Sequence, residues 1–439
     1  MKIAVIGSGI SGLIAAEDLR SKHDVTLFEA SETLGGHTNT VDIDLDGERL
    51  SVDTGFIVFN DRTYPNFCGR LDDWGVEWAP TEMSFSVRCD ASNLEYNGAS
   101  LNKLFIQRRN LFRPGFHRMI RDILRFNREA TALAMSPPDG HPDETVAGFL
   151  SRGRYSREFA EHYLLPMGAA IWSCPLGTFG QFPVRFIAEF YHHHGLLSLR
   201  GRPQWRTVRG GSRRYIDALL RRWGRDVEIR LKTPVTRVRR FPESVQVGIA
   251  GGCEEVFDHV VFACHSDQAL RLLCDATPVE TEVLSSIPYG RNVAVLHTDA
   301  RLLPRRRGAW ASWNYLLPGS TARHAAPATL TYCMNILQHI RSRECLCVTL
   351  NAEDLIDPKR VLARFEYHHP IFTAGRRNAQ ARHGELLNVN RTSFCGAYWG
   401  NGFHEDGVVS AMAVVQAINA APCPETFRQP VRLSLEAAT

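Results

Sequence analysis

The feature that most constrains the fold is a set of three glycines, Gly7, Gly9 and Gly12, directly after the apolar segment 2–6. A short apolar run that ends at a glycine is typical of a strand buried on both faces of a parallel sheet. In a GxGxxG turn the first glycine permits the turn, the second lets backbone approach a pyrophosphate, and the third lets the next helix pack on the strand. We therefore predict a strand at 2–6, a helix at 11–20 and a dinucleotide site at the N-terminus of that helix.

An acidic residue follows at the position that this motif requires. Glu29 ends a second predicted strand, 24–28, and lies about 20 positions beyond the first glycine, the usual place of a ribose-binding carboxylate. A carboxylate there would repel a 2′-phosphate. The dinucleotide is therefore expected to be FAD or NAD rather than NADP.

A second glycine pair, Gly35-Gly36, follows shortly after the acid and precedes His37-Thr38. This arrangement resembles the flavin-containing amine oxidoreductase superfamily, and the resemblance implies FAD as the cofactor. The usual residue after the pair in that superfamily is Arg, so His37 separates this chain from typical amine oxidases. The expected cofactor-binding residues in this part are Gly7, Gly9, Ile10, Ser11, Gly12, Glu29, Ala30, Gly35, Gly36, His37 and Thr38.

Later segments add to the expected FAD site. The stretch 47–59 reads as a strand and a glycine turn, and the resemblance places Thr54 and Gly55 beside the flavin, although a plain hairpin is an equal alternative. Strands are expected at 227–230, 235–239, 245–249 and 256–263, with Val235 making a backbone contact on the adenine side. Near the chain end, a strand into Cys395-Gly396 and a helix opening at His404 resemble the segment that holds the flavin; this implies roles for Gly396, Asp406, Gly407 and Val408.

Composition and sequence pattern argue against several functional classes. The chain has 439 residues, a net charge of +4, and no apolar run of 18 residues that would predict a membrane-spanning helix. Its N-terminus reads as a strand rather than a signal peptide, so we expect a cytoplasmic protein, placed at the inner face of the membrane if it binds lipid. No nucleic-acid partner is expected. The 11 Cys residues show no metal-site spacing, and three consecutive histidines, 192–194, cannot face one ion in regular structure, so no metal is expected.

The segment 101–133 is basic and rich in aromatic residues. On a helical wheel its arginines at 118, 121, 125 and 128 share one face, opposite Phe116, Met119, Ile120, Ile123 and Phe126. A surface helix packed on the core explains this pattern. An interfacial helix within 103–133 explains it as well, with Arg toward anionic head groups and Phe, Met and Ile among acyl chains. A loop is expected at 136–140, and the apolar stretch 161–199 is expected to form a wall of the substrate domain.

The fold predicted from these patterns is α/β, with a Rossmann-type FAD-binding domain and an interleaved α+β substrate domain. The FAD-binding domain is expected to comprise residues 1–70, 203–277 and 388–425, and the substrate domain 71–202 and 278–387. Residues 426–439 are expected to be a C-terminal tail. Within the substrate domain we predict strands at 293–297 and 328–334 and a helix at 358–367.

Four further motifs narrow the resemblance to a bacterial branch of the superfamily. They are Asp53-Thr54-Gly55-Phe56-Ile57-Val58-Phe59-Asn60, Arg202-Pro203-Gln204-Trp205, Tyr332-x-Met334-Asn335-x-Leu337-Gln338 and Cys395-Gly396-Ala397-Tyr398-Trp399-Gly400 with His404-Glu405-Asp406-Gly407. The branch is similar to the flavin domain fused ahead of plant cyclopropane fatty acid synthases, and bacterial members accompany methyltransferases that act on unsaturated phospholipid chains. The resemblance implies a lipid substrate, a role in furan fatty acid formation and association with a fatty acyl methyltransferase.

The chemistry expected of this branch is dehydrogenation of a methylated acyl chain. Amine oxidases of the superfamily usually hold a Lys near the flavin from the middle of the substrate domain, and no Lys occurs here between positions 232 and 359. Dehydrogenation needs an oxidised flavin aimed at the carbon and a base for the proton. His404, Glu405 and Tyr332 are candidates for the base, each with a structural role as the alternative. Tyr398, Trp399, Asn335 and Gln338 are candidates for substrate contact. An amine or amino-acid oxidase and a non-catalytic flavoprotein that supports a methyltransferase remain alternatives.

Overall fold

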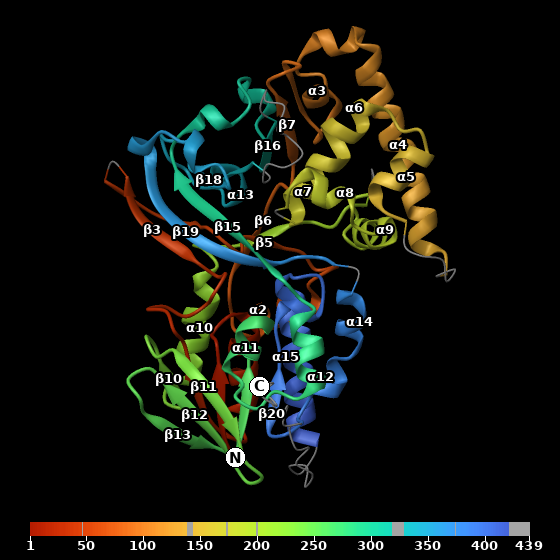
Figure 1. The fold of residues 1–439 in the computed structure, drawn as a ribbon. Coiled ribbons are helices and arrows are strands. Elements are labelled where there is room, and N and C mark those ends of the chain that lie inside the picture. The colour runs from red at the N-terminus through yellow and green to blue at the C-terminus, as the bar shows by residue number, and fades with distance from the viewer. Residues whose placement is uncertain are drawn as a thin grey trace, which may run out of the picture.

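The computed structural model describes residues 1–45, 47–137, 144–172, 174–198, 201–317, 329–373 and 375–420. Figure 1 shows two lobes, with two long strands running between them. The expected tail 426–439 lies outside the described residues, as do positions 138–140 of the expected loop and position 328 of an expected strand. No described helix is long and apolar enough to cross a membrane.

The lobe that holds the N-terminus is built on a five-stranded parallel sheet in the order β10-β2-β1-β14-β20. Its strands are β1 (Lys2–Ile6), β2 (Asp24–Phe28), β10 (Val227–Arg230), β14 (His259–Phe262) and β20 (Thr392–Phe394). The apolar residues of β1 and β14 are buried, as expected for strands covered on both faces. The expected parallel α/β sheet is confirmed. The residue boundaries of the two domains stay predictions.

Helices cover one face of this sheet and a second, smaller sheet covers the other. One core cluster joins α1 (Ile10–Leu19), α2 (Pro65–Asp73), α10 (Arg213–Trp223) and α15 (His404–Ala420) to the strands. The opposite cluster joins the sheet to β11 (Val235–Arg240), β12 (Val245–Ile249), β13 (Glu254–Phe257), α11 (Ser266–Leu272) and α12 (Pro278–Ser285). The continuous strand expected at 256–263 is divided at Asp258, because its backbone and carboxylate both bond to the main chain of Lys2.

The other lobe contains a seven-stranded sheet in the order β19-β15-β18-β17-β16-β7-β8. The strands are β7 (Phe85–Cys89), β8 (Leu94–Asn97), β15 (Tyr289–His297), β16 (Trp313–Leu317), β17 (Leu330–Cys333), β18 (Cys347–Leu350) and β19 (Val361–Pro370), and α13 (Met334–Leu337) follows β17. The long strands β15 and β19 pair along their whole length and run toward the lobe that holds the N-terminus (Figure 1).

The helix expected at 358–367 is wrong, since the chain is extended there as β19. Ala363 and Phe365 pack against one apolar cluster and Val361 against another, whereas the alternating Leu362, Arg364 and Glu366 are exposed. This alternation has the period of a strand, and pairing with β15 satisfies the backbone. Two smaller sheets complete the strands: β3 (Thr40–Leu45) with β4 (Glu48–Asp53), and β5 (Val58–Phe59) with β9 (Arg206–Val208) and β6 (Trp78–Pro80).

A group of helices packs beside the seven-stranded sheet. It comprises α3 (Leu101–Leu104), α4 (Pro114–Met135), α5 (Val146–Arg152), α6 (Arg157–Phe159), α7 (Leu165–Trp172), α8 (Leu176–Gly180) and α9 (Val184–His193); α14 (Arg376–Ala381) lies nearer the first lobe. Phe116, Met119 and Phe126 of α4 are buried in this group. Placing these side chains among acyl chains is therefore wrong, because they fill the protein core.

Candidate cofactor and substrate site

The candidate cofactor site lies where the parallel strands end. The loop 7–12 follows β1, Glu29 follows β2, His265 lies just beyond β14, and Gly396 lies just beyond β20. In parallel sheets the carboxyl ends of the strands share one edge, which is where ligands bind in doubly wound folds. The topology therefore brings together four segments that are far apart in the sequence.

The three glycines of the loop have different structural roles. A Cβ added at Gly12 would lie 1.9 Å from the carbonyl oxygen of Gly7, so this position must be glycine for α1 to pack against the strand. Gly7 adopts φ +102°, which favours glycine. A Cβ at Gly9 would meet no atom within 4 Å, and Gly9 caps α1 without a side-chain hydrogen bond. The open space in front of an uncapped helix N-terminus suits a pyrophosphate.

Glu29 is positioned by the glycine loop itself. Its carboxylate accepts hydrogen bonds from the Ser8 backbone at 3.0 Å, the Ser8 hydroxyl at 2.5 Å and the Ser31 backbone at 2.8 Å. The backbone of Thr233 donates to the Glu29 carbonyl, which brings the turn before Val235 beside the acid. The residues expected on the ribose and adenine side are thus neighbours.

The second glycine pair closes over the first loop. A Cβ at Gly36 would lie 3.3 Å from the Cα of Gly9, and Gly35 and Gly36 adopt φ +122° and +56°. The Gly35 backbone donates to the carbonyl of Ser8 at 3.1 Å. On the far side, Gly55 approaches His37 so closely that a Cβ would lie 2.2 Å from the His37 carbonyl. The segments around 36 and 55, expected near the cofactor, are therefore packed together.

His37 lies in a cluster of imidazoles that the sequence did not indicate. Its ring stacks on Tyr367 with centroids 5.0 Å apart and lies 5.3 Å from His369 and 6.4 Å from His265. Burial lowers the pKa of His265 and His369 to about 4 and holds the pKa of His37 well below its usual value. These histidines are neutral at pH 7. His37 thus brings a neutral hydrogen-bonding ring to a position where Arg would bring a charge.

Several buried polar atoms near this edge have no partner among the described residues. They are His37 Nε2, Tyr398 Oη and two nitrogens of Arg376, Nε and Nη1. The third nitrogen of Arg376 donates to the carbonyls of Tyr398 and Gly400 at 3.2 and 2.8 Å. Burial lowers the pKa of Arg376 to about 10, so it remains charged at pH 7. Buried groups without partners are rare in proteins, and a bound molecule is one way to complete their hydrogen bonding.

The last helix, α15, points its N-terminus at the same edge. A Cβ at Gly407 would lie 2.7 Å from Ile10 Cγ2 and 2.9 Å from Ser11 Oγ, so the first turns of α15 and α1 are in contact. Asp406 does not face outward, because its carboxylate accepts from the Phe403 backbone at 2.8 Å. Burial raises the pKa of Asp406 to about 6. Asp406 therefore orders the start of the helix, and Val408 is buried behind it.

Two of the three candidate bases are held by protein partners. His404 Nε2 hydrogen-bonds to the hydroxyls of Thr38 at 3.0 Å and Tyr215 at 3.3 Å, and burial lowers the pKa of this histidine to about 3. Glu405 caps α2, accepting from the backbone of Asn66 at 3.0 Å and of Phe67 at 2.9 Å. These contacts fasten α15 to the rest of the lobe.

The third candidate, Tyr332, is half-buried between two apolar clusters. Its hydroxyl has no hydrogen-bond partner among the described residues. Burial raises the pKa of Tyr332 well above its usual value. The phenol therefore stays protonated at pH 7 and is suited to donating a hydrogen bond rather than accepting a proton.

Of the residues expected to contact substrate, two use their amides within the protein. Gln338 donates to the Asp53 carboxylate at 2.8 Å and accepts from the Asp53 backbone at 2.9 Å. Asn335 accepts from the Leu346 backbone at 2.7 Å and donates to the carbonyls of Ile340 and Glu344. Both amides hold local structure.

The two aromatic residues expected to contact substrate, Tyr398 and Trp399, have different environments. The indole of Trp399 donates to the Phe394 carbonyl at 3.0 Å and stacks on His383. The ring of Tyr398 lies against Gly396, where a Cβ would be 2.2 Å from Cε1. Tyr398 keeps an unpartnered hydroxyl and Trp399 does not.

An aromatic cluster adjoins the cofactor edge. Phe403, directly before α15, packs on the apolar clusters of both lobes. Its ring stacks on Phe190 at 5.4 Å, and Phe190 lies 4.8 Å from Trp172. The remaining rings of the cluster are Phe179, Phe182, Phe186, Tyr191 and Phe372. Arg376 lies 3.8 Å above the ring of Phe372 and so borders this cluster on the cofactor side.

The triple histidine takes no part in a shared site. His192 and His193 are exposed, whereas His194 is buried with its Nδ1 bonded to the Phe190 carbonyl at 2.9 Å. Across the ranges that the structure describes, no three His, Cys, Asp or Glu side chains come together as a group able to hold a metal ion.

Comparison with known proteins identifies the family. The family described as flavin containing amine oxidoreductase matches residues 10–323. The chain belongs to this family. It is accordingly a flavoprotein with FAD as cofactor and an oxidoreductase, as expected from the sequence. No curated protein sequence matches the chain significantly.

Solved structures of the same fold cover nearly the whole chain. Cyclohexylamine oxidase from Brevibacterium oxydans has 16% identity, a TM-score of 0.66 and coverage of 95% of this chain and 99% of its own. Putrescine oxidase bound to putrescine has 16% identity, a TM-score of 0.65 and coverage of 96% and 100%. The CLA-producing fatty acid isomerase from P. acnes has 14% identity, a TM-score of 0.65 and coverage of 94% and 97%. These similarities establish the fold.

The site described above fits FAD. The open face at Gly9, the free first turn of α1 and the ordered Glu29 provide for a pyrophosphate and a ribose, and the unpartnered His37 Nε2 provides a polar contact nearby. Sequence motifs identified the glycines, Glu29 and His37. They did not identify His265, His369 or Arg376, because no local pattern surrounds these residues and only the tertiary fold brings them to the edge.

Proposed function

We propose that this oxidoreductase dehydrogenates an acyl chain of a membrane phospholipid, with a methylated unsaturated chain as the specific substrate. The observation that carries the proposal is the aromatic cluster of Phe190, Trp172, Phe186 and Phe372, which reaches the cofactor edge through Phe403. Phe186, Phe372 and Phe403 at its margin are only partly buried, and rings in this position suit a hydrocarbon chain because they offer apolar contact with few polar groups. The fold shared with a fatty acid isomerase supports the same substrate class.

The charges at this place do not suit an amine substrate. Arg376 is buried beside Phe372 and bears a positive charge, which would repel an ammonium group. The nearby Asp406 carboxylate is bonded to the Phe403 backbone, which leaves it less available as a counter-ion for such a group. The absence of Lys between 232 and 359 also argues against an amine substrate.

FAD, when bound, would supply the oxidant for a hydride equivalent from one substrate carbon, and the proton lost from the neighbouring carbon would pass to water. The side chains of the protein hold the hydride-donating carbon in place. Tyr332 is the base candidate whose hydroxyl lacks a protein partner in the described structure, and its protonated phenol suits it to holding a substrate oxygen in place. Arg376, with two unpartnered nitrogens, is available to a carboxyl or ester oxygen at the cofactor side of the cluster.

The test is anaerobic reduction of the FAD-loaded protein, followed by absorbance of the oxidised flavin band. Phospholipids with methylated unsaturated chains, dispersed in detergent, are expected to bleach the band, and the matched unmethylated lipids are not. Bleaching by putrescine or cyclohexylamine instead would establish the amine oxidase alternative. If no compound bleaches the flavin, the measurement is repeated with a fatty acyl methyltransferase present. Complex formation without reduction would then support the non-catalytic role.

A further inference from the structure

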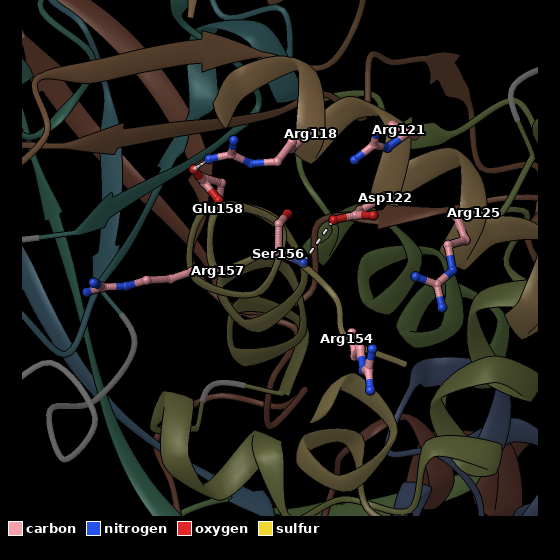
Figure 2. Close-up of a pocket in the computed structure, with 8 residues that line it drawn as sticks. All are labelled: Arg118, Arg121, Asp122, Arg125, Arg154, Ser156, Arg157 and Glu158. Atoms are coloured by element: carbon pink, nitrogen blue, oxygen red, sulfur yellow. Dashed lines mark hydrogen bonds and ion pairs between the residues drawn. The ribbon is translucent and has the colours of Figure 1, made fainter. Parts of the chain in front are cut away.

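A basic pocket lies on the surface of the helical group, away from the cofactor site. It has a volume of about 580 Å³ and is enclosed by α4 and the segment 154–158 (Figure 2). Five arginines and two carboxylates line it: Arg118, Arg121, Arg125, Arg154, Arg157, Asp122 and Glu158. Positive charge therefore exceeds negative charge in this pocket. Nothing in the proposed redox chemistry uses these residues.

The carboxylates do not neutralise all of this charge. Glu158 pairs with Arg118 at 2.7 Å, and Asp122 accepts from the Ser156 backbone at 2.9 Å (Figure 2). The guanidinium groups of Arg121 and Arg154 have no ion-pair or hydrogen-bond partner among the described residues, and both residues are exposed. Two guanidinium groups thus remain free at one pocket, each able to donate two parallel hydrogen bonds to a phosphate.

Apolar side chains lie on the same outward face of α4 as Arg121. Leu124 is 49% exposed and Met135 is 72% exposed, and both follow Arg121 at the spacing that places residues on one side of a helix. Arg128 occupies the same face and is exposed. The outward face of α4 therefore combines arginines with large apolar groups, although its inward face is buried.

The segment just before α4 also exposes apolar groups. Phe112 is 86% exposed and Leu111 is 45% exposed, and both lie close in sequence to Arg108, Arg109 and Arg113. A full aromatic ring held in water costs free energy unless a partner covers it. The side chains of Phe112, Leu124 and Met135 with the free arginines define what we call the basic apolar face.

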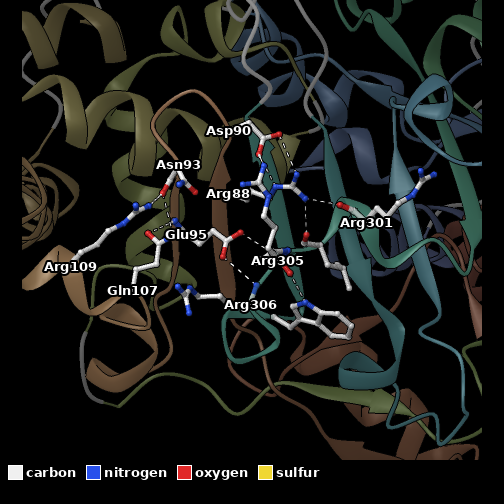
Figure 3. Close-up of polar contacts among 12 residues, drawn as sticks. Arg88, Asp90, Asn93, Glu95, Gln107, Arg109, Arg301, Arg305 and Arg306 are labelled. Atoms are coloured by element: carbon white, nitrogen blue, oxygen red, sulfur yellow. Dashed lines mark hydrogen bonds and ion pairs between the residues drawn. The ribbon is translucent and has the colours of Figure 1, made fainter.

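A polar network holds the residues just before Phe112 in place. Arg109 and Gln107 both donate to the Asn93 carbonyl, and Gln107 accepts from the backbone of Glu95 (Figure 3). The buried Glu95 carboxylate in turn accepts from the backbone of Arg305 at 2.8 Å and of Arg306 at 3.3 Å. Phe112 is thus exposed on an anchored segment, which lowers the entropy lost when a partner covers it.

We propose that the basic apolar face docks this protein on an anionic phospholipid membrane, with lipid phosphate in the pocket of Arg121 and Arg154. Arginines beside exposed aromatic and aliphatic groups match the two layers of a membrane interface, charged head groups and the acyl boundary. A soluble phosphorylated ligand would need the arginines and not the apolar groups. The proposed docking surface does not depend on which substrate the protein oxidises.

The test is co-sedimentation of the FAD-loaded full chain with vesicles. We expect binding to vesicles that contain phosphatidylglycerol, little binding to pure phosphatidylcholine vesicles, and weaker binding as salt increases. The double variant Arg121→Gln, Arg154→Gln is expected to bind roughly thirtyfold more weakly, since each basic residue contributes about a factor of five at an anionic surface. Phe112→Ser is expected to weaken binding without changing the salt dependence.

The matched control is Arg225→Gln, Arg239→Gln, which removes two exposed arginines of the lobe that holds the N-terminus; their guanidinium groups also have no partner among the described residues. It is expected to bind vesicles like the original protein. Equal losses in both double variants would overturn the proposal, as would vesicle binding that neither variant changes. Binding of inorganic phosphate through Arg121 and Arg154 without any vesicle binding would overturn it in favour of a free-anion site.

Oxidation of detergent-dispersed lipid separates this proposal from the proposed function. The Arg121→Gln, Arg154→Gln variant is expected to retain its flavin, its melting temperature and its rate with dispersed lipid, and to lose rate only with vesicles. A protein that binds vesicles through these residues and oxidises no lipid would refute the proposed substrate while the docking surface stands.

Discussion

The imidazole of His37 stacks on the ring of Tyr367 with centroids 5.0 Å apart, and this contact joins the second glycine loop to the long strand β19. The hydroxyls of Tyr367 and Thr54 also form a hydrogen bond of 2.9 Å. Strand β19 therefore contacts both segments expected beside the cofactor, the one around His37 and the one around Thr54. The strand that replaces the expected helix at 358–367 is therefore also the strand that brings the seven-stranded sheet to the cofactor edge. The Nε2 atom of His37 is buried and has no partner in the described ranges.

Replacing His37 by Phe is expected to weaken FAD binding about fivefold and to leave the stacking on Tyr367 in place. The reason is that the ring stays and only its nitrogens are lost, and one hydrogen bond contributes about 1 kcal/mol. The measurement is the flavin released at equilibrium during dialysis. Unchanged FAD affinity, with an unchanged melting temperature, would show that Nε2 does not reach the cofactor.

Two glycine variants are expected to separate cofactor binding from folding. Gly12→Ala places a methyl group 1.9 Å from the Gly7 carbonyl and is expected to destabilise the apoprotein by about 1–3 kcal/mol. Gly9→Ala meets no protein atom within 4 Å and is expected to leave the apoprotein stable but reduce its flavin content. Urea unfolding of the apoprotein and flavin absorbance of the purified protein give the two readouts. If Gly9→Ala retains full FAD, the pyrophosphate does not lie against that glycine.

Replacing Gln338 by Ala is expected to lower the free energy of unfolding by about 1–3 kcal/mol and to leave the KM for the lipid unchanged. The side chain bonds to both the backbone and the carboxylate of Asp53, which is buried, so truncation leaves a buried carboxylate with one donor fewer. Thermal unfolding and steady-state kinetics check the two parts. A raised KM with unchanged stability would instead support the substrate contact expected from the sequence.

Acid is expected to destabilise the protein because several histidines are buried in their neutral form. Burial lowers the pKa of His259 and His404 to about 3 and of His265 and His369 to about 4. The unfolded chain takes up protons near pH 6.5 while the folded chain does not, so stability is present above pH 6.5 and is lost as pH falls toward these values.

The expected loss between pH 7 and pH 5 is about 2 kcal/mol for each of these histidines. Asp53 and Asp406 act in the opposite sense, since burial raises the pKa of each to about 6 and the folded state gains stability from protonation as pH falls from 6. Urea unfolding at pH 7 and pH 5 measures the net change in the free energy of unfolding. His259 lies at the start of β14, so His259→Gln is expected to reduce the pH dependence without changing FAD content. An unchanged pH dependence in this variant would show that His259 does not contribute to the loss of stability in acid.

Local sequence determined the nucleotide-binding half of this protein. The loop 7–12, Glu29 and the pair Gly35-Gly36 predict their own structure, because tight turns and close backbone approaches restrict which residues can occupy them. The strands at 2–6 and 24–28 and the helix opening at His404 follow from apolar periodicity in the same way. These features depend on contacts between residues close in the chain.

Tertiary structure decided the rest. The segment at 361–370 is a strand because β15 pairs with it, and its own residues permit either conformation. The amides of Asn335 and Gln338 and the carboxylate of Glu405 are held by partners that lie in other elements or other turns, and no local pattern predicts those partners. The imidazole cluster and the neighbouring Arg376 likewise exist only where separate elements meet. Packing between distant segments fixed their burial, their charge state and the groups left free to bind a ligand.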